Sequence, residues 1–218
     1  MTGGKNREAV ETLPLAARDA LAGLLTDALA CAQRRPALVA ALATVTGRGG
    51  PSAGREARVH AVLDAAGVRP GVSWAPVAAA RLRAYVDVVE EAPAGAGLGA
   101  RLGQARILFG AGLFFEVHEV LEPAWLAAPG DARRWLQGLI QAAVAWHHWR
   151  AGNRRGAATL AVAAGDKLRD VPPEWCGFPA AEVASAIGSW ALWLTGGQVD
   201  DPPALPLSRP AGPSGPAP

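Results

Sequence analysis

The sequence predicts an all-α protein: a multi-helix bundle, preceded by an additional helical region and followed by a disordered, proline-rich tail. Apolar residues recur at helical spacing along most of the 218 residues. No stretch shows the alternation of apolar and polar residues that is typical of strands. Half of the residues are hydrophobic and 18% are charged, a composition typical of globular proteins rather than of disordered chains.

The amino-terminal region, residues 1–95, is expected to form the smaller helical part. Pro36 should divide its first apolar stretch into two helices, because proline lacks a backbone donor and clashes with the preceding turn. Gly67 is expected to end the next helix, and Ser73 to cap the one after it. Allowing for the break at Pro36, the expected helices cover about residues 13–45, 56–66 and 75–91.

A proline- and glycine-rich segment at 92–99 predicts a boundary, with the bundle over residues 96–197 and the tail over 198–218. Only two of the thirteen aromatic residues, Trp74 and Tyr85, precede this bundle. Since large rings dominate core burial, the bundle should hold the better-packed core. The helices expected there cover about residues 98–110, 113–127, 131–150, 154–168 and 180–194.

Charge and cysteine content exclude several classes of site and partner. The formal charge is only +2, so we expect no nucleic-acid partner. Cys31 and Cys176 are the only cysteines and neither lies in a C-x-x-C pair, which excludes a disulfide framework and a cysteine-based zinc site. No secretory signal and no window of about 18–20 apolar residues is visible. We therefore expect a cytoplasmic protein without a membrane partner.

The most informative segment is 114–125, where polar residues share one face of a predicted helix. His118 and Glu122 are four residues apart, so they should lie side by side, with about 5–6 Å between their Cβ atoms. Trp125 continues the same stripe. Glu119 is turned by about 100° from His118 on an ideal helix. One helix face thus carries a histidine, a carboxylate and a tryptophan together.

Two other residues of this helix bear on the geometry. Pro123 follows Glu122 directly and is expected to kink the helix and release the Glu119 carbonyl. Glu116, like Glu119, is expected to look outward or sideways.

The next predicted helix carries a second polar row. Gln137, Gln141 and His148 fall close to one line on a helix of 3.6 residues per turn. If the two helices pack antiparallel across a short turn, this row faces His118 and Glu122. An unsatisfied buried polar group costs about 1–3 kcal/mol, so these side chains should bind to each other, to water or to an ion.

Residues of both helices resemble the domain of unknown function family 309, whose pattern is HxxxExxW. His118, Glu122 and Trp125 meet this pattern, and the resemblance covers about residues 104–164. It implies a small, all-helical bacterial protein with a metal-binding motif, and it implies no particular reaction.

Three interpretations of this seam stay open: a metal or small-ligand site, a structural hydrogen-bond network in a helical scaffold or interaction protein, and a hydrolase-like enzyme. Imidazole and carboxylate donors suit a divalent ion such as Zn²⁺, Fe²⁺ or Mn²⁺. The expected metal ligands are His118, Glu122 and His148, with Glu119 as an extra ligand. The residues expected to contact a small molecule are Trp125, Gln137 and Gln141. The sequence leaves catalytic residues, reaction and oligomeric state open.

Overall fold

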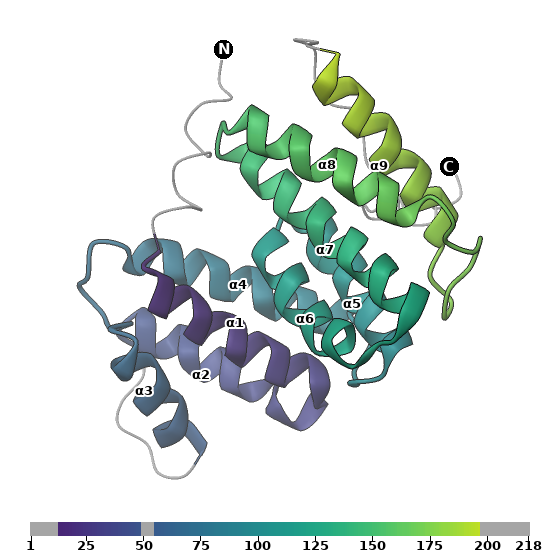
Figure 1. The fold of residues 1–218 in the computed structure, drawn as a ribbon. Coiled ribbons are helices and arrows are strands. Elements are labelled where there is room, and N and C mark those ends of the chain that lie inside the picture. The colour runs from purple at the N-terminus through teal and green to yellow at the C-terminus, as the bar shows by residue number, and fades with distance from the viewer. Residues whose placement is uncertain (1–12, 49–54, 197–218) are drawn as a thin grey trace, which may run out of the picture. The chain divides into compact units, whose positions relative to one another are not determined.

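A computed structural model describes residues 13–48 and 55–196 of the chain (Figure 1). Within these ranges the secondary structure is helical and contains no strand, only an isolated bridge between Trp175 and Phe178, which confirms the predicted all-α class. The predicted tail over 198–218 lies outside the described residues. The chain forms two compact units, residues 1–100 and 101–218, and each is described by itself.

The first unit packs its helices around a core of leucines. It contains α1 (Leu15–Ala30), the short 3-10 helix η1 (Ala32–Arg34), α2 (Pro36–Val45), α3 (Arg55–Ala65) and α4 (Ala75–Glu91). Both α3 and α4 pack against α1 and α2. The largest fully buried side chains of this unit are Leu21, Leu25, Leu29, Leu38, Leu63, Leu82 and Tyr85.

Local signals mark two helix ends of this unit. Pro36 separates the first helices as predicted, because it stands in the first turn of α2, where its missing N–H has no helical partner to lose. Gly67 follows α3 with a φ of 72°, a left-handed conformation that glycine adopts without strain. The predicted Ser73 cap is wrong: Trp74 stands at the cap position and makes no side-chain capping bond, so Ser73 lies one residue too early.

The second unit places its long helices side by side. It contains most of α5 (Leu98–Gly110), then α6 (Phe114–Ala127), α7 (Gly130–Arg150), α8 (Arg154–Leu168) and α9 (Ala180–Thr195). The helix α7 packs against α6 and α8, and α8 packs against α9 (Figure 1). Among the described helices, none combines the length and the apolar character that crossing a membrane requires.

Aromatic rings pack against one another in the core of the second unit. Trp190 is completely buried, and its ring centroid lies 4.6 Å from that of Trp146. Phe109 lies edge-on to Phe114 at 4.9 Å and to Trp146 at 5.7 Å. These contacts join α5, α6, α7 and α9 through one cluster of rings.

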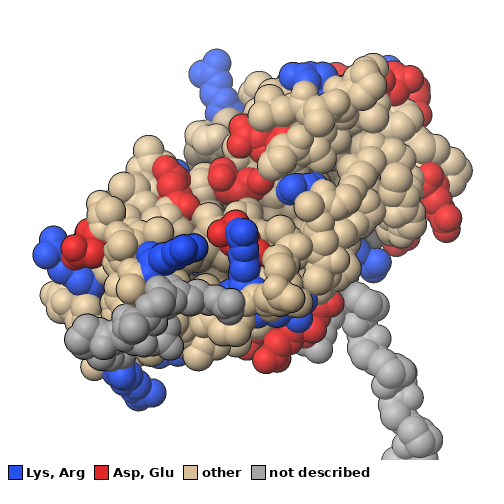
Figure 2. All heavy atoms as spheres, turned by 90° about the horizontal axis from the view of Figure 1, so that it is seen from below, with Lys and Arg blue, Asp and Glu red and all other residues tan. Residues whose placement is uncertain are grey.

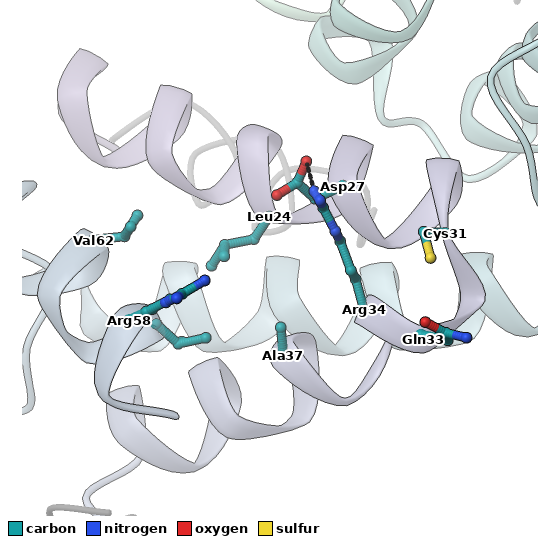
Figure 3. Close-up of a pocket in the computed structure, with 9 residues that line it drawn as sticks. Leu24, Asp27, Cys31, Gln33, Arg34, Ala37, Arg58 and Val62 are labelled. Atoms are coloured by element: carbon teal, nitrogen blue, oxygen red, sulfur yellow. Dashed lines mark ion pairs between the residues drawn. The ribbon is translucent and has the colours of Figure 1, made fainter. Parts of the chain in front are cut away.

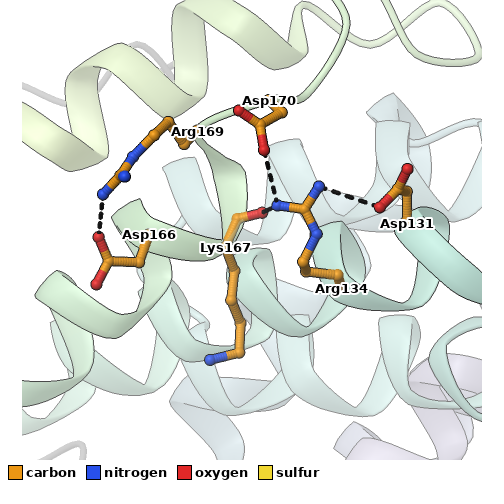
Figure 4. Close-up of polar contacts among 6 residues, drawn as sticks. All are labelled: Asp131, Arg134, Asp166, Lys167, Arg169 and Asp170. Carbon is orange, nitrogen blue, oxygen red and sulfur yellow. Dashed lines mark hydrogen bonds and ion pairs between the residues drawn. The ribbon is translucent and has the colours of Figure 1, made fainter.

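Polar side chains fix the ends of α7 and α8. Asn153 caps α8, since its Oδ1 accepts a hydrogen bond from Gly156 N at 2.9 Å. At the other end of α8, Arg134 of α7 donates to Lys167 O at 3.1 Å (Figure 4). Arg134 also pairs with Asp131 at 3.1 Å and with Asp170 at 3.4 Å. One guanidinium thus satisfies a helix-terminal carbonyl and ties the start of α7 to the end of α8.

A glycine allows the close approach of α7 and α8. A Cβ atom at Gly138 would lie 2.7 Å from Leu168 Cγ and 3.2 Å from Ala164 O. Both neighbours belong to α8, and Leu168 is 1% exposed, so it has little room to move.

The substitution Gly138→Ala is therefore expected to lower the free energy of unfolding by about 1–3 kcal/mol, the range typical of overpacking. Alanine has the higher helix propensity, but the resulting gain of about 1 kcal/mol is expected to be smaller than the cost of overpacking. Gly188→Ala in α9 is the matched control: a Cβ there meets nothing within 4 Å, so the variant should be at least as stable as the parent. Urea denaturation measures both variants. Equal stabilities for the two would contradict this account of the α7–α8 contact.

Candidate functional site

The helix α6 carries the polar stripe at the edge of its buried face. Phe114, Val117, Val120 and Leu121 turn into the core. His118, Glu119 and Glu122 flank them and are half-buried. Pro123 lies inside α6, and the helix nevertheless continues to Ala127.

Three side chains of α6 come together in a compact group, which we call the α6 triad: His118, Glu119 and Glu122. Each offers one nitrogen or oxygen atom, and these atoms all lie within 4.8 Å of one another. His118 Nδ1 lies 3.0 Å from Glu119 Oε1, and the two side chains are 32% and 30% exposed. The sequence predicts the proximity of His118 and Glu122. The structure adds that Glu119, rather than Glu122, contacts the imidazole.

Trp125 lies just beyond the triad and is covered by an arginine of α7. The guanidinium carbon of Arg133 lies 4.7 Å from the ring centroid, a cation–π contact. Arg133 also donates to the carbonyls of Trp125 at 3.1 Å and Leu126 at 3.0 Å, so it caps α6 as well. The indole Nε1 of Trp125 is buried and makes no hydrogen bond to the residues that the structure describes.

The predicted polar row on α7 divides into two parts. Gln137 and Gln141 are half-buried, and Gln141 Oε1 is buried without a hydrogen bond from any described residue. His148 is not part of the α6 triad. Its Nδ1 lies 3.1 Å from Asn153 Nδ2, where α7 gives way to α8. The structure thus brings Glu119, not His148, to His118 and Glu122.

The sequence of these helices matches one family model over residues 102–160, the family described as domain of unknown function DUF309. We refer to the matched segment, residues 102–160, as the DUF309 domain. This domain takes in α6, α7 and all the predicted site residues, and it confirms the resemblance expected from the HxxxExxW pattern. No curated protein and no solved structure matches the chain.

One acidic residue of the DUF309 domain is buried, contrary to the expectation from the sequence. Glu116 is completely buried, so the expectation that it looks outward or sideways is wrong. It stands four residues before Val120 and shares that residue's stripe, and this spacing is a signal that the sequence contains. Gln104 of α5 is only 2% exposed. Arg101 of α5 donates to Val120 O at 2.7 Å. Polar groups are therefore buried on both α5 and α6.

Charged side chains are interspersed on the face drawn in Figure 2, where basic and acidic groups alternate with uncharged ones. Side chains of both signs occur in this view, and the formal charge of the whole sequence is only +2. The absence of a nucleic-acid partner stays a prediction.

Proposed function

We propose that the DUF309 domain binds a divalent transition-metal ion through the α6 triad. The single observation that carries this proposal is the convergence of three donor atoms within 4.8 Å. One imidazole nitrogen and two carboxylate oxygens form a donor set that suits Zn²⁺, Fe²⁺ or Mn²⁺. Two carboxylate charges also balance the charge of a divalent ion.

The spacing of the donors is close to that of a bound site. With metal–ligand bonds of about 2.0–2.2 Å, the ligand atoms of a tetrahedral site lie roughly 3.4 Å apart. The longest separation in the triad, at most 4.8 Å, exceeds this value by about 1.4 Å. Half-buried side chains on one helix can close such a gap by changing rotamers, without any movement of the backbone.

Three protein ligands leave a coordination position for water or a small molecule, as open metal sites do. Two of the residues predicted to contact a ligand support this extension of the proposal. Trp125 offers a buried donor, and Gln141 a buried acceptor, that no described residue satisfies. Since each unsatisfied group costs about 1–3 kcal/mol, water or a bound molecule is expected to supply the missing partners. Gln137 is proposed as a further contact.

A structural network is the competing function, and the 3.0 Å contact between His118 and Glu119 favours it without any ion. In that case His118→Ala lowers the free energy of unfolding by about 1–3 kcal/mol, because it leaves Glu119 without its partner, and no metal is lost. The two functions therefore differ in metal content rather than in stability.

The test is metal analysis of the full, tag-free chain after dialysis against Zn²⁺, Mn²⁺ or Fe²⁺, combined with calorimetric titration. One ion per chain is expected. His118→Ala and Glu122→Ala should weaken binding by more than about 100-fold, beyond the 10–100-fold typical of losing an outer-shell partner. Glu119→Gln should also weaken binding by more than about 100-fold, as expected for a ligand. A loss of only 10–100-fold would instead mark Glu119 as the group that orients His118.

Two histidine variants serve as references in this experiment. His60→Ala lies outside the DUF309 domain and should leave metal binding unchanged. His148→Ala should also retain the ion, since His148 contacts Asn153 instead of the triad. Folded parent protein that takes up none of the three metals would contradict the proposal.

A further inference from the structure

The first unit contains a hollow of about 560 Å³, which the proposed metal site does not use (Figure 3). It lies between α1, the η1 turn, the start of α2 and α3. Leu24 and Asp27 of α1 line one side, and Arg58, Val59 and Val62 of α3 line the other. Its volume falls within the roughly 300–1,000 Å³ typical of pockets for small molecules.

Part of the hollow is apolar. Leu24, Ala37, Val59 and Val62 contribute hydrocarbon from three different helices. Val62 is 44% exposed, although a branched aliphatic side chain is favoured in a protein core. A hydrocarbon group in the hollow would remove this surface from water and gain about 25 cal/mol for each Å² covered.

Among the side chains that the structure describes, those of the hollow leave one positive charge without an ion-pair partner. Arg34 Nη1 lies 2.8 Å from Asp27 Oδ1, so these two groups neutralise each other. Arg58 forms no ion pair with a side chain that the structure describes. Figure 3 shows Arg58 reaching from α3 toward Leu24, beside the apolar wall. An ion pair and a single further guanidinium favour a ligand with one negative charge.

We propose that this hollow binds a small amphipathic monocarboxylate. The carboxylate pairs with the planar fork of Arg58, which can donate two parallel hydrogen bonds to it. The hydrocarbon part lies against Leu24, Val59 and Val62. A phosphate group fits less well, because it carries close to two negative charges at neutral pH. Among the described side chains of the hollow, only the Arg58 guanidinium has no ion-pair partner.

Octanoate is the probe, titrated into the ¹⁵N-labelled full chain and followed through backbone amide shifts. Saturable shifts are expected for amides around the hollow, in residues 24–37 and 58–62. Octanol and octylamine carry the same hydrocarbon part with a neutral or a positive head, and they should bind at least ten-fold more weakly. Acetate and inorganic phosphate lack the hydrocarbon part and should not compete.

Matched variants test both halves of the hollow. Arg58→Ala and Arg58→Gln should weaken octanoate binding by ten-fold or more, and Val62→Glu should do the same from the apolar side. Arg83 is an exposed arginine of α4 that does not line the hollow, so Arg83→Ala should bind like the parent. Equal affinities for octanoate and octanol, an unchanged affinity in both Arg58 variants, or shifts confined to residues 101–196 would each overturn the proposal.

Discussion

Replacing Trp190 with alanine is expected to lower the free energy of unfolding by about 3–5 kcal/mol, the range typical of truncating a fully buried aromatic side chain. Trp190 is completely buried and lies against Trp146 at 4.6 Å between ring centroids. Through Trp146 it supports the rings of Phe109 and Phe114. Its removal therefore opens a cavity at the point where α9 joins the other helices.

Two further variants separate packing from hydrogen bonding. The indole Nε1 of Trp190 makes no hydrogen bond to the described residues, so Trp190→Phe should lose less than half as much stability as the alanine variant. Leu192→Ala, at a residue that is 75% exposed on the same helix, should stay within about 0.5 kcal/mol of the parent. Urea denaturation followed by far-UV circular dichroism measures all three. A loss below about 1 kcal/mol for Trp190→Ala would show that α9 does not depend on this ring.

The substitution Glu116→Ala is expected to lower the free energy of unfolding by about 1–3 kcal/mol, because it removes a buried polar group and leaves the group that Glu116 interacts with unsatisfied. Glu116 is completely buried and interacts with another group of the protein. In the same unit, Gln104 of α5 is only 2% exposed, and Arg101 of α5 donates a hydrogen bond to Val120 O of α6. A small apolar residue cannot satisfy polar groups of this kind.

The variant Glu116→Gln tests whether charge or hydrogen bonding matters at this position. It keeps the shape and one carbonyl oxygen, so a loss much smaller than that of Glu116→Ala indicates hydrogen bonding, and an equal loss indicates charge. Glu174→Ala, at an exposed residue, should change the stability by no more than about 0.5 kcal/mol. If Glu116→Ala were as stable as this control, the buried Glu116 side chain would not contribute to stability.

Helix positions could be predicted closely because local chemistry determines them. Two helices begin where the sequence predicts, because a nearby residue determines the start. Pro36 stands in the first turn of α2, and Asn153 caps α8. The Ser73 cap was predicted wrongly, because a capping residue one position off the helix start cannot reach the free N–H groups.

The candidate site could be predicted only where one helix determines it. The proximity of His118 and Glu122 follows from spacing along α6 alone. The burial of Glu116 depends on how α6 packs against its neighbours, and the distance of His148 from the triad depends on how α7 packs against α6. Spacing along one helix contains neither quantity. The hollow of the first unit is likewise formed by side chains from separate helices, which sequence reading treats one at a time.

All three members of the triad come from a single turn of α6, residues 118–122. An ion held there would act as a local chelate, clamping one helical turn directly before Pro123, where the backbone lacks a donor. Its exchange with solution needs no separation of α6 from α7, so loading and release can be fast while the bundle stays closed.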